Sequence, residues 1–223
     1  MCLDIREAAP TSAALSEHAT IPIAFVVDRV LEVRLLDGGL GGMSLTQTAV
    51  TDPYVKDYDA LEGAGPQCWP GRFDVSNWAL IGARRDGASV GGTVIATRTP
   101  GLHMLGGRDD VAVLWDIRVS PRERGGGIGS ALFRAAGDWA GARGFRWLKI
   151  ETQNVNVPAC RFYQKMGCTL GAIDRFAYPD LPGEVQLLWW KALRARSDPA
   201  SSDELARHLP GGDEGAGATG NPG

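Results

Sequence analysis

A run of glycines after two arginines is the part of the chain best suited to hold a ligand. The stretch Arg122–Phe133 reads RERGGGIGSALF, with glycine at positions 125, 126, 127 and 129. It follows a nearly continuous apolar segment, residues 111–120, and precedes apolar residues at helical spacing. The first turn of a helix presents unpaired N–H groups and the positive end of its dipole, and glycine lets a phosphate approach them closely. The loop is therefore a candidate pyrophosphate site or a plain tight turn, and Arg122 and Arg124 would add charge or lie in solvent.

Two common nucleotide motifs do not match this loop. A Walker loop requires lysine and then serine or threonine after its last glycine, whereas Gly129 is followed by Ser130 and Ala131. The dinucleotide fingerprint GxGxxG also fails, because Ser130 stands where its last glycine is required. A different phosphate-binding loop has to be considered.

Two spaced patterns, taken together, resemble a known family. The spacing Arg124-x-x-Gly127-x-Gly129 resembles motif A of the GNAT superfamily of acyl-CoA-dependent N-acetyltransferases. A second pattern, Asn156-x-x-Ala159-x-x-x-Tyr163, resembles the one that family members carry on a short helix. The order of strand, glycine loop, long helix, strand and short helix is also similar to that of the family.

Longer stretches resemble the streptothricin acetyltransferase group within this superfamily. The stretches are WDIRVSPRERGGGIG, LKIETQNVNVPACRFYQKMGC, LGAIDRFAY, EVQLLWW and the upstream PYVKDY, and the similarity covers residues 21–192. Members of that group often carry a dense acidic run after the PYVKDY segment, of which Asp57, Asp59 and Glu62 remain here. The resemblance implies transfer of an acetyl group from acetyl-CoA, the co-substrate, to a primary amine of a small cationic molecule, such as a streptothricin-type antibiotic, by direct attack in a ternary complex.

The resemblance also implies roles for residues along the cofactor. The backbone of the strand Ile117–Val119, which includes Arg118, would bind the pantetheine arm, and an N–H there would polarise the thioester carbonyl. Asn156 and Ala159 would contact the same arm, and Tyr163 would protonate the departing thiolate. The pyrophosphate would be held by the N–H groups of Arg124, Gly125, Gly126, Gly127, Ile128, Gly129 and Ser130.

Two carboxylates are candidates for the general base that deprotonates the amine. Asp116 interrupts an apolar segment, where an unpaired carboxylate would be costly to bury. Glu151 ends the next apolar segment. Both would attract a cationic substrate and accept its proton, but both would also serve as satisfied structural carboxylates, bonded to backbone or to Arg118 or Lys149. A chain of water molecules to bulk solvent is a further alternative.

Four aromatic residues are candidates for contact with the acceptor: Trp69, Phe73, Trp115 and Tyr178. Trp69 and Phe73 lie in a loop-like segment, residues 52–74, that would border the acceptor site. Tyr178 precedes a turn that contains proline. Packing in the core is the alternative for each of them, as it is for Trp78.

The apolar pattern predicts an α/β domain. Strands are expected at 21–36, 43–50, 111–120, 145–153, 169–178 and 184–193, with a hairpin at 77–99. Helices are expected over Gly129–Arg143 and from Pro158 to Gly167. With the resemblance, this predicts a GNAT fold in which a mixed central sheet of about six to seven strands is flanked by about four helices. We expect a flexible leader at 1–20, the domain at 21–193 and a disordered tail at 194–223.

Composition narrows the class of protein further. The chain has 223 residues and a formal net charge of −3, which disfavours nucleic acid as a partner. Its four cysteines form no CxxC pair and its three histidines lie far apart, so we expect no metal site. The same cysteine usage predicts a reduced, cytoplasmic setting. No apolar run reaches the roughly 18 residues that a membrane span requires. We expect a monomer or a homodimer.

Two other functions fit the same fold. One is acetylation of protein N-termini or lysines, which would need an open groove in place of a walled pocket. The other is a non-catalytic acyl-CoA-binding module, which would bind the cofactor without turnover. A hydrolase is disfavoured, because the chain has no GxSxG elbow and its histidines lie outside the motif region.

Overall fold

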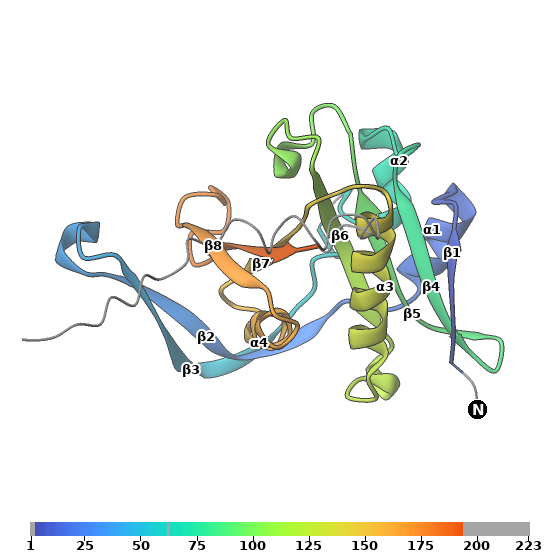
Figure 1. Cartoon of the computed structure of the whole chain (residues 1–223). Coiled ribbons are helices and arrows are strands. Elements are labelled where there is room, and N and C mark those ends of the chain that lie inside the picture. The colour runs from blue at the N-terminus through green and yellow to red at the C-terminus, as the bar shows by residue number, and fades with distance from the viewer. Residues whose placement is uncertain (1–2, 62, 194–223) are drawn as a thin grey trace, which may run out of the picture.

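A computed structural model describes residues 3–61 and 63–193 of the chain. Within them, seven strands form one mixed sheet in the order β1-β4-β5-β6-β7-β9-β8 (Figure 1). Neighbouring strands are antiparallel except for the central pair β6 and β7, which are parallel. The strands are β1 (Leu3–Ala8), β4 (Ala79–Arg85), β5 (Ala88–Ala96), β6 (Val111–Val119), β7 (Trp147–Gln153), β8 (Thr169–Asp174) and β9 (Gln186–Ala192).

Helices cover both faces of this sheet. On one face, α3 (Ile128–Ala142) and α4 (Val157–Lys165) pack over a core that includes Leu114 and Leu148. On the other face, α1 (Ser12–Ala19) and the single turn α2 (Trp69–Arg72) pack over Val111 and Val113. The alternation of Ala112 and Leu114 with Val111 and Val113 explains why β6 reads as a continuous apolar segment.

The long helix α3 forms where the sequence predicts it, because its apolar residues recur on one side. Ile128, Leu132, Phe133, Ala136 and Ala140 are all buried against the sheet. Gly127 precedes the helix with φ of 87°, a left-handed conformation that glycine adopts without strain. The start of α3 is therefore set by a glycine rather than by a side-chain cap.

Two long strands form a separate ribbon beside the sheet. The strands β2 (Phe25–Leu35) and β3 (Met43–Lys56) pair only with each other, and the ribbon extends away from the central sheet (Figure 1). Asn154 ties it to the domain, since its side chain donates to the Leu31 carbonyl at 3.1 Å and accepts from the Val185 N–H at 2.8 Å. The strand predicted at 43–50 thus continues through 56, so the start of the segment predicted to be a loop, 52–74, is strand.

The prediction of a flexible leader at 1–20 is wrong for the residues described from Leu3 onward. Residues of β1 pair with β4 along their whole length, and α1 is capped by Thr11, which accepts from the Ala14 N–H at 3.2 Å. Leu15 is fully buried. The domain therefore begins before residue 21, and the sequence concealed this because an edge strand is held by backbone pairing rather than by apolar side chains. The tail at 194–223 lies outside the described residues, as does Glu62.

The burial of Leu15 gives a direct test of the N-terminal segment. Truncation by Leu15→Ala is expected to lower the free energy of unfolding by about 2–5 kcal/mol, because it leaves a cavity beneath α1. The exposed neighbour Ser16 supplies the matched control, and Ser16→Ala is expected to change stability by less than about 0.5 kcal/mol. Urea denaturation of both variants measures this, and equal stabilities would show that the segment does not belong to the core.

Candidate active site

The central strands β6 and β7 separate halfway along their length. Their ladder runs only from Val111 to Leu114 on β6, opposite Trp147 to Ile150 on β7. A bulge marks the point of separation, because β5 pairs Val94 with Asp116 but Ile95 with Leu114, which leaves Trp115 as the extra residue. Beyond the bulge, residues 116–119 keep their β5 partners and have no partner on β7.

A cavity of about 870 Å³ occupies this region, a size typical of ligand sites. It is lined by the separated halves of β6 and β7, by the glycine loop, by one side of α4 and by Tyr58, Asp59, Leu61 and Ala64. Figure 1 shows α3 and α4 side by side on the same face of the sheet. The predicted cofactor residues Ile117, Arg118 and Val119 all line it.

The glycine loop presents its backbone to one end of this cavity. Gly125 and Gly127 have φ of 83° and 87°, and a Cβ at either position would face open space. The first intrahelical bond of α3 runs from the Ala131 N–H to the Gly127 carbonyl, so the N–H groups just before it have no partner inside the helix. Gly129 and Ser130 line the cavity too, which fits a site for an anionic group. Gly126 and Ile128 do not line it, and the Gly126 N–H donates to the Glu123 carbonyl at 3.3 Å.

The side chain of Arg124 has a structural task that the sequence did not reveal. Its guanidinium donates to the carbonyls of Val119 at 3.1 Å, Pro22 at 3.1 Å and Ala24 at 3.3 Å. The arginine thus ties the segment before β2 to the glycine loop, while its main chain remains at the cavity. Arg122 is exposed on the surface.

Tyr163 reaches the cavity from α4. Its ring packs against Phe162 and Phe133 with centroids 5.2 and 5.9 Å apart, and the side chain is otherwise buried. Burial, with a smaller effect from the negative charge of Asp116, raises the pKa of its hydroxyl, so the group holds its proton. The predicted cofactor residues Asn156 and Ala159 also line the cavity, and the Asn156 side chain caps α4 by accepting from the Ala159 N–H at 3.2 Å.

Asp116 is paired from two directions. His18 Nε2 lies 2.8 Å from Oδ1, and Arg118 donates to both carboxylate oxygens at 2.9 Å. Burial alone would raise the pKa of Asp116, but the hydrogen bonds from His18 and Arg118 hold it below the ordinary value. A carboxylate held ionised by two fixed partners is a poor proton acceptor, so this geometry disfavours Asp116 as the general base.

Glu151 is the second carboxylate in the cavity. Its Oε1 accepts from the Tyr178 hydroxyl at 2.6 Å, and its Oε2 accepts from Gln186 Nε2 at 2.8 Å. Neither partner carries a positive charge, in contrast to the partners of Asp116. Burial and the adjacent Glu151 raise the pKa of Tyr178, which therefore remains a donor to the carboxylate.

The predicted acceptor aromatics divide into two kinds. Trp69 and Trp115 line the cavity, and with Phe73 and Trp78 they form one cluster in which ring centroids lie 5.4 to 6.1 Å apart. Among the described residues, Phe73 and Tyr178 are not part of the cavity lining. Phe73 packs on Trp115 and Tyr178 donates to Glu151, so each affects the cavity only through the lining residue that it contacts.

Sequence reasoning missed His18 and underrated Asp59. His18 is buried beside Gly92, where a Cβ would lie 2.6 Å from His18 Nδ1, and it meets Asp116 across 98 positions of the chain. Asp59 lines the cavity and accepts from both terminal nitrogens of Arg118. No local pattern signals either contact, because each residue pairs with a distant strand.

The expectations about metals and membranes concern the described part of the chain only. Within residues 3–61 and 63–193, no cluster of three or more histidine, cysteine, aspartate or glutamate side chains is placed to hold a metal ion. No helix in the same residues is long and apolar enough to cross a membrane.

Comparison with known proteins agrees with the geometry. The acetyltransferase (GNAT) family matches residues 48–168. A streptothricin acetyltransferase of Escherichia coli is 31% identical over 177 residues, which are 78% of this chain and 88% of that protein. The crystal structure of a nourseothricin acetyltransferase matches with a TM-score of 0.68 and 26% identity, covering 87% of this chain and all of that one. A structure described as a putative streptothricin acetyltransferase from Bacillus anthracis in complex with acetyl coenzyme A matches with a TM-score of 0.66 and 26% identity, over 86% of this chain and all of that one.

Two glycines of α3 allow a matched test of the cavity. A Cβ at Gly129 would lie 3.6 Å from Val119 and 3.7 Å from Phe162, both of which line the cavity, whereas a Cβ at Gly137 would meet only Leu193 at 3.6 Å. Both alanine variants are expected to gain about 0.5–1 kcal/mol of helix stability. Only Gly129→Ala is expected to weaken acetyl-CoA binding, by about tenfold, because its methyl group would lie beside cavity-lining side chains and keep the cofactor from approaching the helix backbone closely. Calorimetric titration with acetyl-CoA measures this, and equal affinities would place the cofactor elsewhere.

Proposed function

We propose, from the premise that this chain belongs to the GNAT family of acetyltransferases, that it acetylates a primary amine of a small cationic molecule of the streptothricin type. The chain is an acyltransferase, and acetyl-CoA is its co-substrate. The names of its relatives point to streptothricin or nourseothricin as the acceptor. The identity of the acceptor and the roles of individual residues are the proposal.

One observation carries this proposal. The cavity between β6 and β7 is lined at one end by the glycine loop and elsewhere by Tyr163 and Glu151. An amide-containing arm finds unpaired strand edge at residues 115–119, and an anionic group finds helix N–H groups at the loop. The residues present therefore suit acetyl-CoA, which supplies an activated acetyl thioester and a thiol leaving group.

Glu151 is placed to act on the amine. An amine that enters as an ammonium ion must lose a proton before it can attack a carbonyl, and a carboxylate within the same cavity accepts that proton. Tyr178 and Gln186 hold the two oxygens of Glu151 in fixed directions. The negative charge also favours a cationic acceptor over a neutral one.

Tyr163 is placed to act on the leaving group. Its hydroxyl retains its proton because burial and Asp116 raise its pKa, and it opens on the cavity that Glu151 shares. A donor of this kind protonates a thiolate as it departs, which prevents the reverse reaction. The ammonium ion loses two protons on becoming the amide. Glu151 takes the first and releases it to solvent, and the second restores Tyr163 after the tyrosine has protonated the thiolate, so one proton leaves the protein per turnover.

An amine panel tests the acceptor and Tyr163 together. Thiol release from acetyl-CoA is measured with streptothricin, aminoglycosides, polyamines, lysine and N-terminal peptides. We expect turnover on streptothricin or a related cationic antibiotic, and a fall in kcat of about 10²-fold for Tyr163→Phe, because a general acid contributes about 10²–10⁴-fold. Tyr54→Phe, on the exposed ribbon, is the control and is expected to leave kcat unchanged.

The outcomes of this panel separate the alternatives. Turnover on peptides alone would replace the proposal with a protein acetyltransferase. Binding of acetyl-CoA with no turnover on any of the amines would favour a binding module.

Substitution of Glu151 tests the general base. Glu151→Gln keeps the size of the side chain and removes its charge, so kcat/KM for the amine is expected to fall by about 10²-fold or more. The affinity for acetyl-CoA is expected to stay within about twofold, because Glu151 lies on β7 whereas the glycine loop follows β6. Glu32→Gln on the ribbon serves as control. An unchanged kcat/KM would assign the proton transfer to solvent.

A further inference from the structure

The loop that follows β3 forms a wall of the cavity and is held at its centre by one ion pair. We define the acceptor loop as residues 57–61 and 63–65; its members Tyr58, Asp59, Leu61 and Ala64 line the cavity. Asp59 accepts from Arg118 Nη2 at 2.9 Å and from Arg118 Nη1 as well, a two-pronged contact of fixed geometry. The Arg118 side chain is 1% exposed and that of Asp59 25%, so the pair spans from the core to the cavity.

Arg118 is itself fixed by a buried chain of contacts. Its Nε and Nη2 donate to Asp116, and its Nη1 also donates to the Ile21 carbonyl at 3.3 Å. Asp116 in turn meets His18 of α1 at 2.8 Å. Charged groups at this depth keep their places because each would be left unpaired by any movement. The position of Asp59 is therefore fixed by residues of α1 and β6, which belong to the core.

The two ends of the acceptor loop have separate and different attachments. Tyr58 donates to Glu184 at 2.7 Å, and the Ala64 carbonyl accepts from Trp69 Nε1 at 3.0 Å. Between them, among the described residues, the side chain of Asp59 makes the only ion pair of the loop. Loss of this pair would release the middle of the loop while both ends stay attached.

The acceptor loop borders the part of the cavity that would hold the amine rather than the part that would hold the cofactor. The glycine loop and α4 occupy the other part of the lining, where an anionic group and its arm are accommodated. The acceptor loop bonds to Trp69 instead, through the Ala64 carbonyl, and Trp69 packs on Trp115 in the cluster on the opposite face of the sheet from α3. Movement of this wall would thus alter the amine site and leave the phosphate site intact.

We infer that Asp59 is a positioning residue, which holds the acceptor loop through Arg118, Asp116 and His18 and thereby sets the affinity for the amine. The pair also shapes the charge of the site. Asp59 and Asp116 share one guanidinium, so these two carboxylates carry one more negative charge than Arg118 neutralises. This inference rests on the proposed function only in taking the acceptor to be a cationic amine.

The variant Asp59→Asn tests the inference, because it keeps the shape of the side chain and removes the ion pair. Steady-state kinetics with the amine that the panel identifies are expected to show KM raised about tenfold and kcat within about twofold. The Kd for acetyl-CoA, measured without amine, is expected to be unchanged. Hydrogen exchange of the backbone amides at 57–61 and 63–65 is expected to become at least about tenfold faster.

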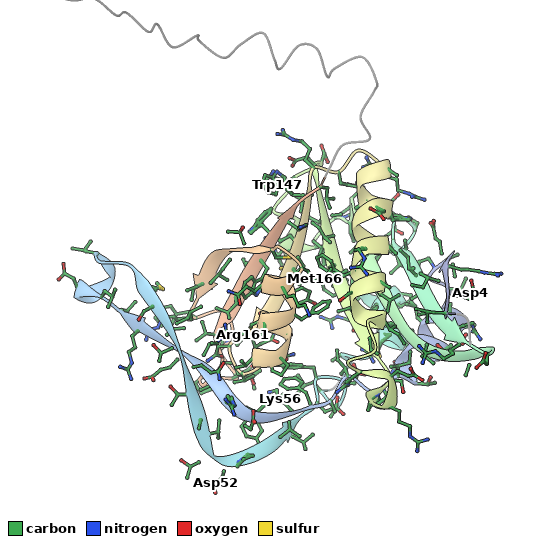
Figure 2. The ribbon with its side chains drawn as sticks, turned by 60° about the horizontal axis from the view of Figure 1, so that its bottom comes forward. Asp4, Asp52, Lys56, Trp147, Arg161 and Met166 are labelled. Atoms are coloured by element: carbon green, nitrogen blue, oxygen red, sulfur yellow. The ribbon has the colours of Figure 1, made fainter. Side chains whose placement is uncertain are left out.

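Two further variants serve as controls. Asp52→Asn removes a carboxylate from the outside of the bend in β3, which Figure 2 shows away from the rest of the domain, and is expected to change none of these quantities. Asp59→Glu keeps the carboxylate and is expected to recover most of the exchange protection and most of the KM.

Each result decides the question. Unchanged KM and unchanged exchange in Asp59→Asn would overturn the inference, and so would a parallel loss of acetyl-CoA affinity and kcat, which would show general destabilisation. If the wild-type protein turned over no cationic amine, the proposed function would fail. The exchange comparison, which needs no acceptor, would still show whether the ion pair holds the loop.

Discussion

The separation of β6 from β7 after Leu114 and Ile150 is the constraint on which the rest of the site depends. In a continuous ladder the backbone groups of these central strands would satisfy each other and leave no room for a ligand. Both strands keep their outer partners beyond the separation, since β5 follows β6 to Val119 and β9 follows β7 to Gln153. The gap therefore opens inside the sheet, between walls that are themselves held by hydrogen bonds.

Three segments of the chain meet at the gap between β6 and β7. The glycine loop follows β6 after one short turn, Pro121–Glu123, and lines the same cavity as the half of the strand that has no β7 partner. The helix α4 begins just after β7 and carries Tyr163 to the same place. Arg124 bonds the carbonyls of Pro22 and Ala24 and thereby closes the N-terminal segment against the loop. Residues far apart in the sequence thus meet at one point because two strands diverge there.

The two carboxylates predicted as general base, Asp116 and Glu151, differ in what surrounds them. Asp116 meets an arginine and a histidine in the interior and is best suited to hold other groups in place. Glu151 meets a phenol and an amide, which orient it without neutralising its charge. The charges of the partners therefore suit one carboxylate, Asp116, to a structural role and the other, Glu151, to the reaction. The aromatic cluster around Trp115 packs against the bulge in β6 and so restrains the strand that carries Asp116.

Local features of this protein follow from its sequence alone. The apolar period of α3, the glycines before it and the cap of α4 are determined by residues within a few positions of one another, and they place the glycine loop and Tyr163 correctly. Trp69 and Trp115 line the cavity, and their contact with the acceptor stays a prediction.

Contacts between distant segments were decided by the tertiary structure. The strand β1 is held by the backbone of β4, the side chain of Arg124 by three carbonyls, and Asp116 by His18, 98 positions away. The sequence pattern shows which residues are apolar and how they repeat, but it does not show which charge meets which. A backbone edge or a buried carboxylate accepts any suitable partner, and only the packed sheet determines which partner reaches it.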